Sequence, residues 1–203
     1  DALDSLYPHW RPVSAMDSEA RFAADGWFRL RNKATEILTQ QPEKYPVAQS
    51  HHGHGDLTGF TFSHDGRPVL VDPGRKDYTK AALSRKFLSG SFHNCPLVDG
   101  IAPVAELFFK KWIPVPYAAV KIDAAFSADN CLRIEHDGFS RIGTPVRHVR
   151  SIMVDDAQVK VNDEFSGSGE HEVLLCWHFA PGFAVECDDP ECIRVTSASS
   201  TVR

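Results

Sequence analysis

Histidine and aspartate side chains with the spacing of a metal site are the residues of this sequence best suited to chemistry. His52 and His54 lie two apart in a histidine- and glycine-rich segment, and Asp72 and His93 follow. On an extended strand, residues two apart point to the same face, so both imidazoles could serve one site. A set of His, Asp and His suits zinc, and it would also suit iron, manganese or nickel. Three protein ligands leave one coordination position open for water or a substrate.

The stretch between His54 and Asp72 predicts a β-hairpin that would bring these two side chains together. Residues 57–63 alternate in polarity, Asp65-Gly66 favours a tight turn, and residues 68–71 can return as a strand. His93 comes shortly before another expected strand. A solvated histidine-rich loop beside a plain Asp-Pro-Gly turn would explain the same residues without a metal. Residue chemistry alone leaves both interpretations open.

The elements that must position these residues are mostly strands. Thirteen prolines and thirteen glycines divide the 203 residues into short apolar segments, which is typical of an all-β, antiparallel sandwich. At most one or two short helices are expected, and residues 77–88 could form a helix or an extended substrate loop. Residues 1–20 are predicted to be a linker or docking arm, and residues 21–203 the β-sandwich domain. The expected strands are 22–30 (broken at Asp25-Gly26), 34–38, 57–63, 68–71, 96–98, 117–122, 131–136, 146–154, 158–165 and 172–179.

The charge of the chain limits its partners. A formal net charge of -5 argues against nucleic acid, because phosphate binding needs a basic face. An acidic sugar can still be bound by a local group of basic residues. Such a group follows the Asp72 turn, although it could equally be a solvated face. It consists of Arg75, Lys76, Lys80, Arg85 and Lys86.

Membrane insertion and a disulfide framework are both disfavoured. No apolar run approaches the roughly 20 residues that a bilayer-spanning helix requires. The five cysteines are odd in number and include no CxxC pair, although Cys187 and Cys192 are close enough for a local bridge. The chain begins without methionine, so we expect a fragment or a processed form.

An ordered set of motifs resembles the heparinase II/III-like family of bacterial polysaccharide lyases. The resemblance covers roughly residues 20 to 185. In two places this sequence departs from the family: Cys95 stands where threonine is usual, and the interval from Asp72 to His93 is shorter than in several members. The motifs are 52–56, 66–74, Tyr78, 92–94 with 98–100, 137–141, 148–150 and 177–181.

The resemblance implies a two-part protein of which this chain is the second part. In the family, a helical toroid precedes an antiparallel β-sandwich of the supersandwich type. Members cleave uronic-acid polysaccharides, such as heparan sulfate or alginate, by β-elimination. The catalytic tyrosine and asparagine of the family are expected on the toroid, and nothing in this chain matches that part. A periplasmic or secreted location is the corresponding expectation.

The resemblance also implies roles for individual residues. The ligands of a divalent metal, most often zinc, would be His54, Asp72 and His93. The catalytic residues within this chain would be His52, facing the uronate carboxylate, and Tyr78, close to the cleft. The expected substrate-binding residues are Arg75, Lys80 and Asn94.

Two other classes of function fit the same residues. The chain could be a non-catalytic carbohydrate-binding or scaffolding domain that keeps the metal for structure. It could also be a cupin-like metal oxygenase, which uses a similar set of His and carboxylate ligands. Formation of unsaturated uronate products would separate the first class from a lyase, and bound iron in place of zinc would favour the second.

Overall fold

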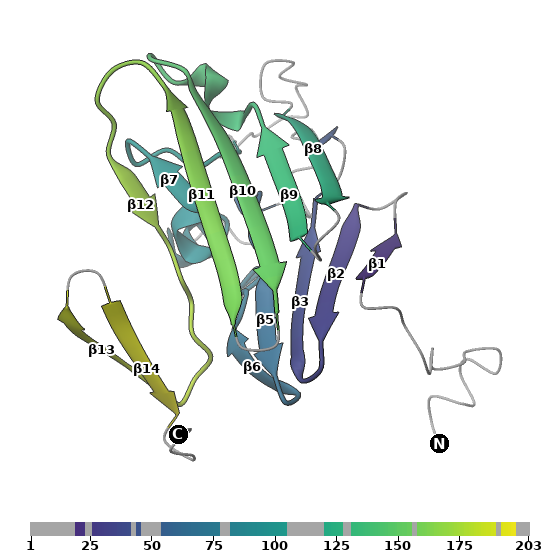
Figure 1. Cartoon of the computed structure of the whole chain (residues 1–203). Coiled ribbons are helices and arrows are strands. Elements are labelled where there is room, and N and C mark those ends of the chain that lie inside the picture. Colours follow the sequence, from purple (N-terminus) through teal and green to yellow (C-terminus); the bar gives the residue numbers. More distant parts are fainter. Residues whose placement is uncertain are drawn as a thin grey trace.

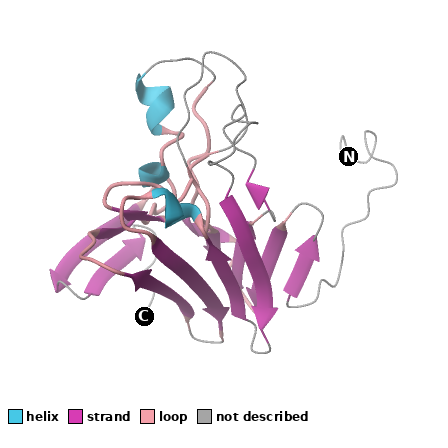
Figure 2. Ribbon diagram, turned by 90° about the horizontal axis from the view of Figure 1, so that it is seen from above, coloured by secondary structure: helices cyan, strands magenta, loops and turns pink. Residues whose placement is uncertain are grey.

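The expected all-β fold is confirmed by a computed structural model of the chain (Figure 1). It describes residues 19–22, 26–41, 44–45, 54–77, 82–104, 120–127, 131–155, 158–189 and 192–197. Among them, none of the helices is long and apolar enough to span a bilayer. The only α-helix described is α2 (Ala82–Lys86), joined by the 3-10 helices η3 (Gly90–Phe92) and η5 (Gly138–Arg141). These short helices gather on one side of the strands (Figure 2).

Two antiparallel sheets of five strands each make up most of the fold. The first has the order β1-β2-β3-β5-β6 and the second the order β11-β10-β9-β8-β4. The first sheet contains β1 (Glu19–Phe22), β2 (Trp27–Asn32), β3 (Thr35–Gln40), β5 (Thr61–His64) and β6 (Arg67–Leu70). The second contains β4 (Lys44–Tyr45), β8 (Val120–Ser127), β9 (Cys131–His136), β10 (Val146–Val154) and β11 (Val159–Gly167).

Two smaller sheets of two strands each complete the described fold. One pairs β7 (Pro96–Val98) with β12 (Val173–Leu175), and the other pairs β13 (Phe183–Asp189) with β14 (Cys192–Ser197). The strand expected at 172–179 is shorter than predicted. After β12 the chain leaves β7 and reaches β6, where Val71 donates its backbone N–H to the carbonyl of His178. Cys187, in the last hairpin, is exposed to solvent.

The two large sheets share one hydrophobic core, as a sandwich requires. From the first sheet come Phe28, Leu30 and Ile37, and from the second come Leu132 and Ile152, all of them buried. Alternation along the strands explains this arrangement, because every second residue of β9 is buried. In β9, the alternating polarity of the sequence thus determines which side chains enter the core.

The predicted hairpin between the first and second candidate ligands forms, but its first strand, β5, is shorter than the expected strand 57–63. Asp65 and Gly66 have φ angles of 50° and 70°, the two positive values of a type I′ turn. The turn sets His64 opposite Arg67 and Phe62 opposite Leu70. Local turn chemistry therefore returns the chain toward the loop that carries His54.

Polar side chains replace apolar ones at one end of the sandwich core. Gly138 donates its N–H to His136 Nδ1 (3.1 Å), which leaves Nε2 to donate to Nδ1 of His148 (2.8 Å). Nε2 of His148 then donates to Asp163 Oδ1 (2.8 Å). Arg150 donates to both oxygens of Asp163, at 2.7 and 2.9 Å. The chain of bonds requires two neutral histidines beside one buried ion pair.

Burial sets the charge of these groups. It lowers the pKa of His136 well below its usual range, and the nearby His148 and Arg150 add to the effect. It also lowers the pKa of His148, against the opposing hydrogen bond with Asp163. Burial alone would raise the pKa of Asp163, but the hydrogen bonds from His148 and Arg150 outweigh it and hold that pKa at about 2. All three groups thus take up protons less readily in the folded chain.

The two histidines make stability depend on pH. Unfolded, both titrate near pH 6.5; folded, they stay neutral to lower pH, so the unfolded chain binds more protons below that value. We expect them to lower the free energy of unfolding as pH falls from about 7.5 to about 5.5, by up to about 1.4 kcal/mol per pH unit each. The contribution of Asp163 is lost only further down, as pH falls below about 4 toward its folded pKa.

Urea unfolding at both pH values measures this effect. The quantity compared is the change in the free energy of unfolding between the two pH values, in wild type and in His136→Gln. Other titrating groups contribute equally to both proteins, so the difference reports His136. The variant should show the smaller change with pH. The control is His64→Gln, because His64 lies on the surface. Equal changes in wild type and His136→Gln would contradict the assignment of neutral histidines.

Candidate metal centre

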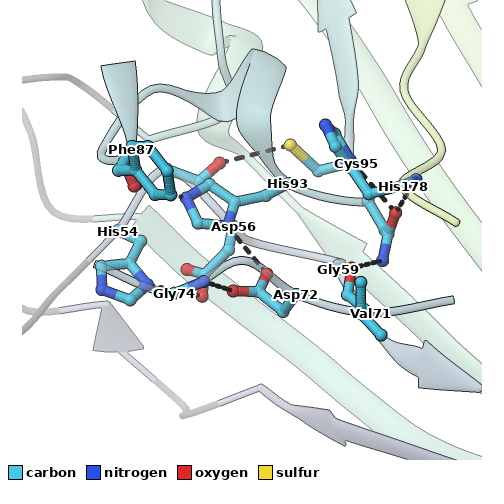
Figure 3. Close-up of polar contacts among 12 residues, drawn as sticks. His54, Asp56, Gly59, Val71, Asp72, Gly74, Phe87, His93, Cys95 and His178 are labelled. Atoms are coloured by element: carbon cyan, nitrogen blue, oxygen red, sulfur yellow. Dashed lines mark hydrogen bonds and ion pairs between the residues drawn. The ribbon is translucent and has the colours of Figure 1, made fainter. Parts of the chain in front are cut away.

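The structure brings together the three residues that the sequence selects as metal ligands (Figure 3). One potential ligand atom from each of His54, Asp72 and His93 lies within 4.8 Å of the other two. The rings of His54 and His93 stack at 5.1 Å between centroids, with 9° between their planes. His93 Nδ1 lies 2.7 Å from Asp72 Oδ2. Three separate segments of the chain therefore converge on one point.

The partners of these side chains fit a bound cation. His93 Nε2 donates to the carbonyl of Phe87 (3.1 Å), which directs Nδ1 toward Asp72. Asp72 Oδ1 accepts the N–H of Gly74 (2.8 Å), which leaves Oδ2 facing His93. A histidine ligand that donates its other nitrogen to a carbonyl, and a carboxylate ligand that is itself hydrogen-bonded, are the usual outer partners of a metal. The residues present therefore fit zinc or a similar divalent ion.

The electrostatics of the site centre on His93. Burial alone would lower the pKa of His93, but the hydrogen bond and charge of Asp72, together with the charge of Asp56, outweigh it and raise that pKa. The His93 side chain is 0% exposed, whereas Asp72 and His54 keep 27% and 19% of their side-chain surface. One side of the site is thus closed by protein, and the other is open to solvent and to ligands.

Glycines allow the loop that carries His54 to pack against the segment before His93. A Cβ atom on Gly55 would lie 2.7 Å from the backbone nitrogen of Gly90, so no larger residue fits there. The Gly55 N–H donates to the carbonyl of Leu88 (2.9 Å). The buried thiol of Cys95, whose pKa is raised by burial, donates to the carbonyls of Gly55 and Gly90. Cys95 therefore links the loop that carries His54 to the segment before His93.

Asn94 is fully buried and bonds three parts of the site to one another. Its Nδ2 donates to the carbonyls of Phe60 (2.9 Å) and Val71 (3.0 Å), and its Oδ1 accepts the backbone N–H of His178 (2.7 Å). Val71 directly precedes Asp72, and Asn94 directly follows His93. The family resemblance implies a substrate contact at Asn94, but the structure places its amide inside the protein, where it fixes the spacing of two candidate ligands.

Asn94→Ala is expected to lower the free energy of unfolding by about 1–3 kcal/mol, because buried carbonyl and N–H groups would lose their partner. Asn94→Asp should be at least as damaging, since it sets a carboxylate oxygen against the two carbonyls. Urea unfolding measures both. Asn162→Ala, at a surface position of β11, is the control. A loss no larger than that of the control would show that Asn94 does not hold the segments together.

Arg150 is a further residue of this region, and no motif of the sequence assigns it a role. Its Nη1 donates to the carbonyls of Thr58 (3.0 Å) and Asn94 (2.8 Å), which belong to the loops of His54 and His93. The guanidinium also lies 5.8 Å from the ring centre of Phe60 and 5.2 Å from that of Trp177. The available signal was the position of Arg150 in β10, where alternation places it on the same inward face as Val146, Ile152 and Val154.

Of the remaining predicted site residues, the structure describes only Arg75. Arg75 is half-buried and donates from Nε to the carbonyl of Asp77 (3.0 Å). Lys76, its neighbour in the basic group, forms an ion pair with the Asp77 carboxylate at 2.7 Å. The predicted residues His52, Tyr78 and Lys80 lie outside the described residues.

Solved structures of glycosaminoglycan lyases share this fold. One heparinase III structure has a TM-score of 0.64 and 18% identity, over 90% of this chain and 29% of its own. A second heparinase III structure has a TM-score of 0.60 and 20% identity, over 84% of this chain and 26% of its own. The heparan sulfate lyase HepC from Pedobacter heparinus has a TM-score of 0.63 and 12% identity, over 92% of this chain and 30% of its own. At these identities the likeness shows the fold, and the chain spans less than a third of each matched protein.

Family membership comes from the sequence itself. No curated protein matches the chain. A family model described as "Heparinase II/III-like, C-terminal" matches residues 17–202, which is nearly the whole chain. This chain therefore belongs to the heparinase II/III-like family and corresponds to its C-terminal part.

Proposed function

We propose that this chain is the metal-binding C-terminal domain of a polysaccharide lyase that cleaves uronic-acid glycans by β-elimination. The observation that carries the proposal is the convergence of His54, Asp72 and His93 within 4.8 Å, in a chain of this family. The substrate would be an acidic polysaccharide, such as a glycosaminoglycan or alginate. We propose zinc as the ion and a periplasmic or secreted location for the protein.

The proposed role of the ion is organisational: when bound, it would hold the three ligand-bearing segments in one geometry. This would also fix the position of His52, which lies two residues before His54 in the sequence. β-Elimination removes a proton beside the uronate carboxylate, and positioned donors must stabilise the charge that develops there. An imidazole can supply such a donor or carry the proton, because it titrates near neutral pH. We assign this role to His52.

The remaining groups would bind the substrate or complete the reaction. Tyr78 would line the cleft as the second catalytic residue of this chain, and Arg75 and Lys80 would attract the polyanion. For Asn94 we propose an indirect role, in which it sets the distance between His93 and Asp72. The tyrosine that protonates the leaving oxygen would come from an N-terminal helical domain, which would form the toroid of the complete enzyme.

One observation favours an alternative for the isolated chain. Because it spans less than a third of the matched lyases, the chain by itself could bind glycan without cleaving it. It would then act as a carbohydrate-binding domain with a structural metal.

An elimination assay tests the proposal. The chain, alone and joined to the helical part of its parent protein, is incubated with heparan sulfate and with alginate. We expect the joined protein to form unsaturated uronate, seen as an increase in ultraviolet absorbance, and the His52→Ala form to show no such increase. A joined, folded and zinc-loaded protein that releases no unsaturated product from any uronic-acid glycan would refute the lyase assignment.

A further inference from the structure

A pocket of about 300 Å³ extends from the candidate ligands His54 and Asp72 to the outer face of the first sheet. His54, Asp56 and Asp72 line the side nearest the candidate metal, and Trp27 and Leu38 line the side formed by β2 and β3. A volume of this size falls at the lower end of the range for small-molecule sites. The pocket can therefore take one sugar unit of a glycan that passes the metal centre.

Strand alternation explains why Trp27 faces this pocket. Phe28 and Leu30 point into the core, so Trp27 points to the other face of β2, where it is 36% exposed. Across the sheet, Trp27 pairs with Gln40, and Leu38 pairs with Thr61.

An aromatic ring, an aliphatic side chain, an amide and a hydroxyl therefore share one face and line the same pocket. This mixture suits a sugar ring, which has apolar C–H faces and hydroxyl groups at its edge.

The charge of the pocket selects among sugar units. Among the described residues that line it, two carry carboxylates (Asp56 and Asp72) and none is lysine or arginine. Arg29, on the same face of β2, is engaged with the carboxylate of Glu36 (Nε to Oε2, 2.8 Å). A bound divalent cation would balance the two carboxylates and leave no excess positive charge. A uronate placed here would lose hydration without gaining a counter-charge.

We propose that this pocket is a subsite for an uncharged sugar unit, the N-acetylhexosamine that alternates with uronate in a glycosaminoglycan, with Trp27 as its stacking platform. The uronate then lies outside the pocket. This inference rests on the proposed function, because it assumes a glycan bound beside the metal centre. It assigns Trp27, Leu38 and Gln40 to the recognition of one particular unit of that glycan.

NMR titration of the zinc-loaded chain tests the subsite. The probes are di-N-acetylchitobiose and glucuronic acid, and the signal followed is the indole N–H of Trp27, identified by its loss in Trp27→Ala. We expect the disaccharide to shift this resonance with saturation, and glucuronic acid to bind at least about 10-fold more weakly, which corresponds to about 1.4 kcal/mol. Glucuronic acid binding as tightly as the disaccharide would overturn the proposal.

Two variants and a control sharpen the test. Trp27→Ala, followed by the remaining resonances, should lower the affinity for the disaccharide about 10-fold or more. Gln40→Lys places a cation opposite Trp27 and should raise the affinity for glucuronic acid. Leu174→Ala, on the exposed strand β12, should change neither affinity. Undiminished disaccharide binding by Trp27→Ala would remove Trp27 from the site.

The outcome is independent of the elimination assay. A failed titration would refute the subsite and leave the lyase assignment in place. A failed elimination assay beside successful, Trp27-dependent binding would refute the lyase assignment and favour a carbohydrate-binding domain.

Discussion

Asp72→Ala is expected to abolish zinc binding by this chain. Asp72 is the one carboxylate of the candidate trio, and its Oδ2 lies 2.7 Å from His93 Nδ1. Replacing an outer partner of a metal ligand typically lowers affinity about 10- to 100-fold, so removing the ligand itself should cost more than 100-fold. Calorimetric titration of the metal-free chain with zinc measures the loss directly.

Stability provides a second measurement of the same prediction. Zinc at 100 times its dissociation constant should raise the free energy of unfolding of the wild-type chain by about 2.7 kcal/mol. The Asp72→Ala chain should show no such increase at the same zinc concentration. Glu170→Ala, which removes an exposed carboxylate, is the control and should keep the full increase. If the wild-type chain gains nothing from zinc, or if Asp72→Ala gains as much, the metal assignment is wrong.

Arg150→Met should cause the largest loss of stability among the variants considered. The side chain is 0% exposed and forms an ion pair with Asp163. Methionine fills a similar volume but leaves the Asp163 carboxylate buried beside one neutral histidine. Removing one partner of a buried ion pair typically costs about 3–5 kcal/mol, mainly because the remaining charge is uncompensated. Urea unfolding should show a decrease of this size.

Two comparisons separate this mechanism from a general loss of packing. Arg147→Met changes a residue of the same strand, but Arg147 is 53% exposed in its pair with Glu135, so this substitution should cost far less stability than Arg150→Met. Arg150→Met combined with Asp163→Asn removes the stranded charge and should be more stable than Arg150→Met alone. If the double variant is less stable, the buried charge is not the cause.

Arg150 also connects stability with the metal centre. It donates to the carbonyls of Thr58 and Asn94, and these residues belong to the segments of His54 and His93. Moving either segment would change the distance between the candidate ligands. A lower zinc affinity in folded Arg150→Met would therefore show that the second sheet helps to position the candidate metal site.

The parts of the fold that the sequence predicts well depend on neighbouring residues. Asp65 and Gly66 select a tight turn by their own backbone preferences, and β9 follows alternation along a single segment. The strand expected at 172–179 was wrong in length because its second half pairs with β6 instead of β7. The choice between two partner strands is not encoded in the segment itself.

The sequence by itself determined the β class of the fold and the hairpin between His54 and Asp72. It also selected His93 as the third candidate ligand, both by residue chemistry and by the family resemblance. Only the tertiary structure decided that the buried amide of Asn94 bonds to the segments of two candidate ligands. It also decided that Arg150 bonds to the loops of His54 and His93, and that Trp27 lines the pocket beside them. The physical reason is the range of the forces involved. Turn preference and alternation act between residues close in sequence, whereas Arg150 meets the carbonyl of Thr58 across 92 residues, a contact that exists only once both sheets have packed.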